Sequence, residues 1–173
     1  MQLKHIQPVY FSPTHTSAKI VTMIAEGMDI MVNTEIDLTY PSADQKTIPS
    51  DTLAIIGVPT YAGRIAPTAL ERLQKIKGDN TPAIIVVLYG NRDYEDALLE
   101  LRNTAKQLGF VPVAGGAFIG EHSYSTEEFP TAAGRPDVSD IQIAAEFGKN
   151  IIKQLYQYTD IKKLPVLDVK GNF

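Results

Sequence analysis

The fold of this chain is decided by Val9-Tyr10-Phe11-Ser12-Pro13-Thr14-His15-Thr16-Ser17, an apolar run that ends in a cluster of hydroxyl and imidazole side chains. An amphipathic segment follows at once, with apolar residues at helical spacing between Val21 and Met28. This order predicts a buried strand, a tight turn and a helix. Because a helix start carries unpaired N–H groups and the positive end of the helix dipole, the turn suits an anion such as phosphate.

The hydroxyls of Ser12, Thr14, Thr16 and Ser17 would add neutral donors around that anion. Serine and threonine also cap helices for purely structural reasons, so the turn alone does not establish a binding site. Its position after the first strand favours one, because open α/β sheets bind ligands beyond the carboxyl ends of their strands. The turn has no lysine and neither GxxxxGK[ST] nor GxGxxG spacing, and therefore suits holding a phosphate better than transferring one.

The rest of the chain alternates apolar runs with amphipathic segments. Strands are expected over 3–11, 34–38, 52–58, 83–89 and 111–119, with helices between and after them. Continuous apolar runs within the third and fourth strands are typical of strands covered on both faces. We therefore predict an α/β fold, a doubly wound parallel sheet with helices on both faces. The domain is expected to span 1–160, and 161–173 to form a linker or a surface strap.

Composition narrows the classes of function. The 173 residues fit one domain, and a net charge of −4 argues against nucleic acid as the main partner. With no cysteine, the chain can form no disulfide and no cysteine-ligated cluster of its own. No apolar run reaches membrane-spanning length, so a cytoplasmic protein without a membrane partner is expected. No catalytic or metal-ligating residue is predicted.

Three further loops are expected at the same sheet edge as the turn. The loop after the third strand contains Pro59, Thr60, Tyr61, Ala62 and Gly63, and the loop after the fourth contains Tyr89, Gly90, Asn91 and Tyr94. A third loop follows the last strand and runs from 120 to 136. A phosphate turn beside loops with glycine and tyrosine suits a ligand with a phosphate at one end and a flat ring at the other. Any one tyrosine alone is more simply a half-buried loop residue.

These motifs together resemble a known family. Residues 12–17 resemble the flavodoxin phosphate loop, 57–67 the second flavin loop and 89–97 the third. The sequence is most similar to the flavodoxin domain that precedes a ferredoxin-type iron–sulfur module in one group of bacterial and archaeal flavoproteins. Residues 120–125 and 133–137 also resemble motifs of that group. The resemblance implies a flavodoxin-like sheet of order 2-1-3-4-5 and FMN as cofactor. It also implies that the turn hydroxyls hold the phosphate, that Tyr94 stacks on the ring, and that Gly63, Gly90 and Asn91 offer it backbone groups.

Two histidines leave alternatives open. His15 stands where the family usually carries glycine, so the chain either tolerates a positive φ there or places a charge beside the phosphate. The simpler interpretation is a tolerated, exposed loop residue. His122 lies in the last loop, where it is either a proton donor or ordinary polar surface.

Two functions remain after these arguments. The first is an electron carrier that exchanges electrons with a ferredoxin-type iron–sulfur protein or domain; the second is an NAD(P)H-dependent FMN or quinone reductase. A phosphorylated receiver domain is excluded, because Ser12 and Pro59 stand where its acidic residues would be. A phosphate binder without flavin would leave the aromatic loops unexplained. Homodimer formation is left open.

Overall fold

A parallel sheet forms the centre of the computed structural model, which describes residues 3–172. Its strands lie in the order β2 (Ile36–Asp37), β1 (His5–Tyr10), β4 (Thr52–Tyr61), β7 (Thr81–Tyr89) and β8 (Phe110–Ile119). Counted along the chain, these five correspond to the predicted order 2-1-3-4-5, and all of the pairs between them are parallel. The predicted α/β fold class is confirmed.

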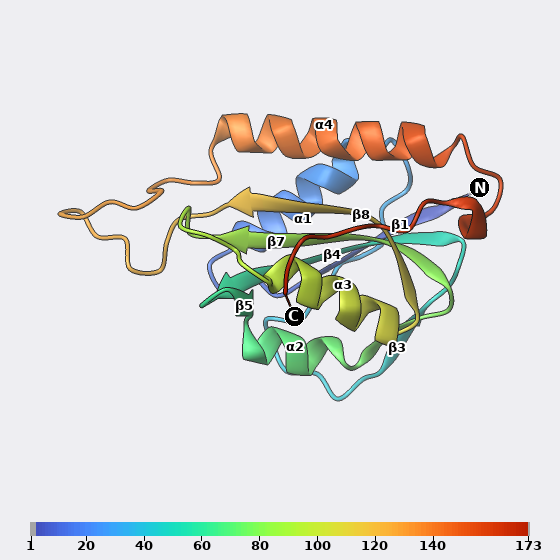
Figure 1. The fold of residues 1–173 in the computed structure, drawn as a ribbon, viewed down its shortest axis with the longest axis horizontal. Coiled ribbons are helices and arrows are strands. Elements are labelled where there is room, and N and C mark those ends of the chain that lie inside the picture. Colours follow the sequence, from blue (N-terminus) through green and yellow to red (C-terminus); the bar gives the residue numbers. More distant parts are fainter. Residues whose placement is uncertain (1–2, 173) are drawn as a thin grey trace.

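Helices cover both faces of the sheet (Figure 1). α1 (Thr16–Glu26) and α4 (Val138–Leu155) lie on one face, while α2 (Pro67–Leu73) and α3 (Ala97–Gln107) lie on the other. Neighbouring residues of β4 point to opposite faces: Ile55 packs with α1 and α4, Ile56 packs with α2 and α3, and both are fully buried. Continuous apolar runs are therefore needed in the central strands, because neither face meets water.

Three short strands were not predicted. β3 (Lys46–Ile48) pairs with β6 (Ile76–Gly78) in a separate two-stranded sheet, and β5 (Arg64–Ile65) pairs antiparallel with the end of β4. Strands of two or three residues are too short to show a period-two pattern. The pairing with β5 also carries β4 to Tyr61, three residues beyond the expected end at 58.

α1 and α4 approach so closely that their contact requires glycine. A Cβ atom built on Gly148 of α4 would lie 2.1 Å from the carbonyl oxygen of Ile24 in α1. The reverse holds at Gly27, the residue that ends α1, whose Cβ would lie 2.1 Å from the carbonyl oxygen of Ala145. This contact fixes the C-terminal half of α1 against α4.

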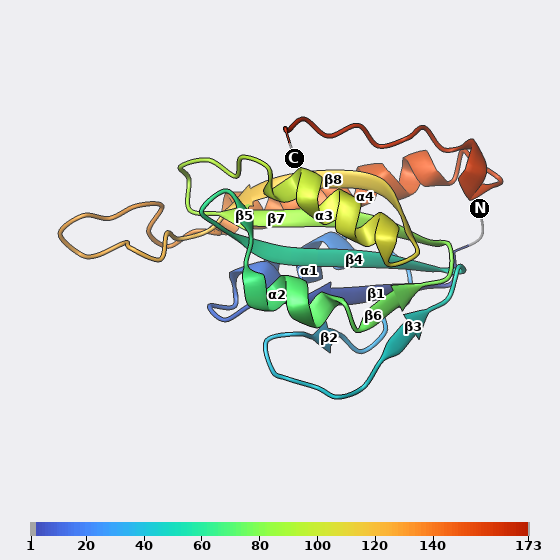
Figure 2. The same ribbon diagram turned by 60° about the horizontal axis from the view of Figure 1, so that its bottom comes forward.

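The segment that follows α4 turns back across the molecule. After a short 3-10 helix, η1 (Ile161–Lys163), it runs beside β8 and α3 (Figure 2). Leu167 packs against the core on that face and its carbonyl accepts a bond of 3.3 Å from Arg102, while Asn172 N–H donates to Asp96 at 2.9 Å. The described part of this segment therefore lies along the surface of the domain. That the segment is a linker or a strap stays a prediction, and Phe173 lies outside the described residues. Among residues 3–172, no helix is long and apolar enough to cross a membrane.

Replacing Gly148 by alanine should destabilise the protein by about 1–3 kcal/mol, because the added methyl group forces α1 and α4 apart. In an uncrowded helix the same change would stabilise by about 1 kcal/mol, so the sign is diagnostic. Urea unfolding measures the difference, with exposed Lys149→Ala on the same helix as the matched control. A Gly148→Ala protein more stable than the parent would contradict the close approach.

Candidate functional site

The turn between β1 and α1 is built around His15 and Ser12. His15 is the N-cap of α1 and adopts a left-handed conformation with φ 62°. Its N–H donates to the Ser12 carbonyl at 3.1 Å, and the buried Ser12 Oγ accepts the N–H of Ala18 at 3.0 Å. The Ser12 side chain therefore satisfies one N–H group in the first turn of α1. The N–H groups before it have no partner inside the helix, as at any helix start.

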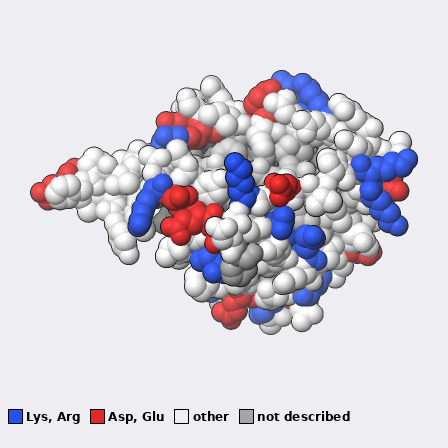
Figure 3. All heavy atoms as spheres, in the orientation of Figure 1, with Lys and Arg blue, Asp and Glu red and all other residues white. Residues whose placement is uncertain are grey.

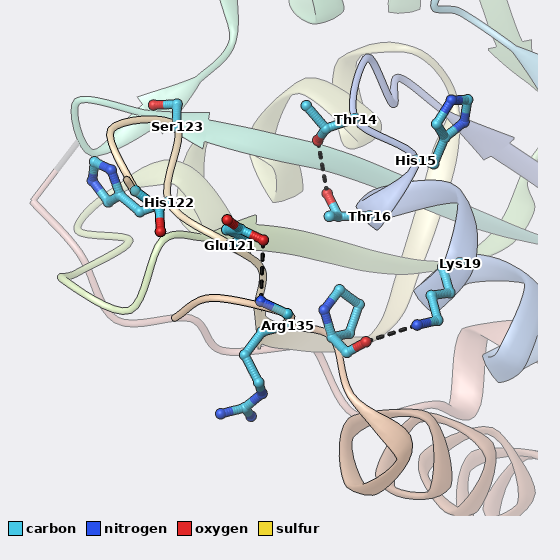
Figure 4. Close-up of a pocket in the computed structure, with 11 residues that line it drawn as sticks. Thr14, His15, Thr16, Lys19, Glu121, His122, Ser123 and Arg135 are labelled. Atoms are coloured by element: carbon cyan, nitrogen blue, oxygen red, sulfur yellow. Dashed lines mark hydrogen bonds between the residues drawn. The ribbon is translucent and has the colours of Figure 1, made fainter. Parts of the chain in front are cut away.

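The other three hydroxyls of the turn differ in their surroundings. Thr14 Oγ1 and Thr16 Oγ1 lie 3.4 Å apart (Figure 4). Ser17 is only 1% exposed, and its hydroxyl has no hydrogen-bond partner; the hydroxyl of Thr60, at the end of β4, is also buried and unpartnered. Such a group costs about 1–3 kcal/mol when left unpaired. Both residues line one cavity of about 100 Å³, so a ligand there could satisfy two buried hydroxyls.

The loop after β4 is tied to the loop after β7 and to α3. Asp96 N–H donates to the Gly63 carbonyl at 3.1 Å. Buried Glu100 accepts two bonds from Arg64, at 2.6 and 3.0 Å, and one from the Ile65 N–H at 2.9 Å. These bonds raise the pKa of the Arg64 guanidinium. Ala62 and Gly63 both have positive φ, which this tight turn requires.

The tyrosines of these loops play different parts. Tyr61 is 49% exposed and lines the small cavity together with Tyr89. Tyr94 is half-buried and packs edge-to-face on Tyr89, with ring centroids 5.4 Å apart. In this structure Tyr94 therefore supports Tyr89 and does not line the cavity.

The structure brings most of the predicted site residues to this cavity. Those that line it are Thr14, Thr16, Ser17, Pro59, Thr60, Tyr61, Tyr89 and Gly90. Those that lie around it without lining it are Ser12, His15, Ala62, Gly63, Asn91 and Tyr94. Asn91 is exposed, with φ 60°. In the described part of the chain, no group of three or more acidic, histidine or cysteine side chains could hold a metal ion.

Residues 121–136, here called the arm, were not among the predicted site residues although they border the site. The arm projects from the end of β8 beyond the sheet (Figure 1). A larger cavity of about 490 Å³ lies between its base and the turn, lined among others by Thr16, Lys19, Glu121 and Arg135. The arm's exposed tip carries Glu127 and Glu128, and acidic atoms show there in Figure 3. The sequence predicted a loop at this sheet edge but, because a polar loop has no periodicity, it did not predict the cavity at the base of that loop.

The base of the arm is fixed to α1 and to α4. Lys19 of α1 donates to the Pro136 carbonyl at 2.7 Å, and Arg135 pairs with buried Asp140 in the first turn of α4. The hydrogen bonds from Arg135 lower the pKa of the Asp140 carboxyl. Within the base, Glu121 N–H donates to the Arg135 carbonyl at 3.0 Å.

His122 connects the arm to the loop after β7 by packing against Gly90. Its ring lies on Gly90, where an added Cβ would come within 2.3 Å of the ring. The Tyr124 N–H donates to His122 Nδ1 at 3.0 Å, so the neutral ring carries its proton on Nε2. Gly90 is thus required by the packing of His122 as well as by the cavity.

The fold and the position of the cavity together define a flavodoxin-like domain with a candidate site beyond the carboxyl ends of β1, β4 and β7. No protein-family model matches the chain, and no curated protein matches it. Solved structures do match it. They include the rubredoxin oxygen:oxidoreductase of Desulfovibrio gigas, with a TM-score of 0.61 and 16% identity over 90% of this chain and 37% of that one.

Two other solved structures extend the comparison. A flavodoxin from the domain Archaea has a TM-score of 0.53 and 13% identity, covering 88% of this chain and 99% of its own. A flavone reductase has a TM-score of 0.63 and 9% identity, covering 94% of this chain and 66% of its own. At these identities the comparisons establish the flavodoxin-like fold. The chain spans nearly all of the archaeal flavodoxin but about a third of the oxidoreductase.

Replacing His15 by glycine should stabilise the protein by about 1 kcal/mol, because glycine adopts a positive φ without the steric penalty of a side chain. Thermal or urea unfolding measures the change. His15→Ala is the matched control, since alanine removes the imidazole and keeps the strained backbone. Equal stabilisation by both substitutions would show that the imidazole, and not the backbone, is unfavourable.

Proposed function

We propose that this chain binds FMN at the edge formed by β1, β4 and β7, and that it carries electrons. The observation that supports this most directly is the pair of buried, unpartnered hydroxyls of Ser17 and Thr60, which border one cavity beside a helix start. A phosphate and a ribityl chain carry the acceptor and donor atoms that such hydroxyls lack. An apolar ligand would leave both unsatisfied.

The residues around this cavity offer the kinds of group that FMN requires: donors for the phosphate and aromatic side chains for the ring. The hydroxyls of Thr14, Thr16 and Ser17 and the first N–H groups of α1 would hold the phosphate. Tyr61, Tyr89 and Gly90, which line the same cavity, would lie along the ring. When bound, FMN supplies one- and two-electron redox chemistry, and the chain's own part is to hold and orient it.

This assignment gives Ser12 and Tyr94 indirect parts. The Ser12 hydroxyl is used to accept the Ala18 N–H, so it shapes the turn that holds the phosphate. Tyr94 holds Tyr89 in place by an edge-to-face contact, and stacking of Tyr94 on the flavin would require that contact to rearrange.

The electron partner that we propose is an iron–sulfur protein or domain of ferredoxin type. The resemblance of the sequence motifs to fused flavodoxin and ferredoxin proteins supports this partner. The chain contains no cysteine, so such a centre has to lie outside these 173 residues.

A reductase that takes hydride from NAD(P)H is the second candidate. Tyr61 favours it, since this tyrosine is half exposed and leaves one side of the cavity without a fixed aromatic cover. The similarity to a flavone reductase supports this candidate, because that protein is named a reductase and has a similar fold.

FMN should bind more tightly than riboflavin, and Ser17→Ala should reduce that preference. Removing one hydrogen bond to the phosphate should weaken FMN binding about tenfold and leave riboflavin binding unchanged. The same change removes an unsatisfied buried hydroxyl and should stabilise the flavin-free protein. Fluorescence titration with both flavins measures the affinities, with exposed Ser139→Ala as control. Equal affinity of the unmodified protein for FMN and riboflavin would rule out the phosphate turn.

The reaction with electron donors should separate the two functions. A carrier should exchange electrons rapidly with reduced ferredoxin and oxidise NADH or NADPH slowly, because it offers no nicotinamide site beside the flavin. Stopped-flow absorbance of the FMN-loaded protein with each donor makes the measurement. Rapid NAD(P)H oxidation with a quinone acceptor, and no exchange with ferredoxin, would favour the reductase.

A further inference from the structure

The base of the arm places a carboxylate beside the turn that would hold the flavin phosphate. Glu121 lines both the small and the large cavity, together with Thr14 and Thr16. Figure 4 shows its carboxylate on the side of the arm that faces the two threonine hydroxyls. Its Oε2 accepts the Gly134 N–H at 3.1 Å, which fixes the side chain in this position.

The basic groups around the larger cavity do not leave an excess of positive charge. Lys19 is the cation on α1, and Glu121 opposes it across the cavity. Arg135 is paired with Asp140 and lies 3.6 Å from Asp137.

His15 and His122 are the remaining titratable side chains that line the larger cavity. His15 is exposed and lies on the far side of the threonine hydroxyls from the arm (Figure 4). His122 accepts the Tyr124 N–H at Nδ1, and its ring lies on Gly90. Glu121 is the acidic side chain that lines the larger cavity, and among residues 3–172 no cation pairs with it directly.

We infer that Glu121 limits the affinity of the site for the phosphate of FMN, so that the flavin is held exchangeably. This inference rests on the proposed function. Glu121 is exposed, so its carboxylate repels a phosphate across the shared cavity by a Coulomb interaction that water and salt screen in part. The repulsion doubles when the phosphate passes from one negative charge to two, which happens near pH 6.

The same argument gives the dependence of this effect on the charge of the phosphate. Neutral hydroxyls and N–H groups can hold a phosphate of either charge, whereas Glu121 repels the dianion more strongly than the monoanion. Glu121 should therefore lower the affinity most above about pH 6, where a phosphomonoester is mainly a dianion.

Glu121→Gln tests this role, because the amide oxygen still accepts the Gly134 N–H and only the charge is removed. Dissociation constants for FMN and riboflavin are measured by fluorescence titration at pH 5.5 and pH 8. The variant should bind FMN about tenfold more tightly than the parent at pH 8 and about threefold more tightly at pH 5.5. Riboflavin, which has no phosphate, should bind both proteins equally. The ratio of variant to parent at each pH removes the contribution of His15 and His122, which are present in both.

Glu127→Gln, at the exposed tip of the arm, is the matched control, since it changes the net charge equally without facing either cavity. It should leave FMN affinity unchanged. Equal FMN affinity of parent and Glu121→Gln would overturn the inference alone. An equal change for riboflavin would also overturn it, because Glu121 would then contact the ribityl chain or the ring. If neither protein binds FMN, the proposed function fails and this inference fails with it.

Discussion

Burial of both faces of β4 and β7 is the constraint on which the rest of the molecule depends. Ile55 and Ile56 of β4, and Ile84 and Ile85 of β7, alternate between two cores and are fully buried. A strand buried on both faces has to be flanked by helices, and parallel strands need crossover connections that supply them. The strands then end at one edge, where their last residues meet loops instead of core. The candidate site lies there because that edge brings loops from different strands together.

Within the turn after β1, similar hydroxyls have different physical roles. Ser12 is buried and satisfied, because its oxygen accepts a helix N–H. Ser17, five residues later, is equally buried, yet its oxygen has no partner. The first hydroxyl contributes to folding, whereas the second costs stability until something binds. Side-chain type and spacing cannot distinguish these roles; only the direction of each side chain in the folded turn does.

The sequence predicted the strands and helices, whose burial leaves a periodic pattern of apolar residues. It did not predict individual side-chain contacts between separate segments, which leave no such pattern. The runs around Ile55 and Ile85 predicted the central strands and, with the flavodoxin resemblance, their order. The pair Arg64–Glu100 was not predicted, because an ion pair between residues 36 positions apart leaves no periodic signal. The loop over 120–136 was predicted at this sheet edge, but its fixed base was not, since that base is held by side-chain and backbone bonds such as the one between Glu121 and Gly134. Stacking of Tyr94 on a flavin, which the resemblance implies, stays a prediction; in the structure its ring packs on Tyr89.

The loop after β4 and the base of the arm are held by the same kind of contact. Buried Glu100 accepts two hydrogen bonds from Arg64, whose side chain is 44% exposed, and one from the buried Ile65 N–H. Buried Asp140 pairs with Arg135, whose side chain is 30% exposed. In both pairs one partner is buried and the other reaches water, so salt should weaken each pair only in part. Under the proposed function, both loops that border the FMN site are therefore held in place before the flavin binds.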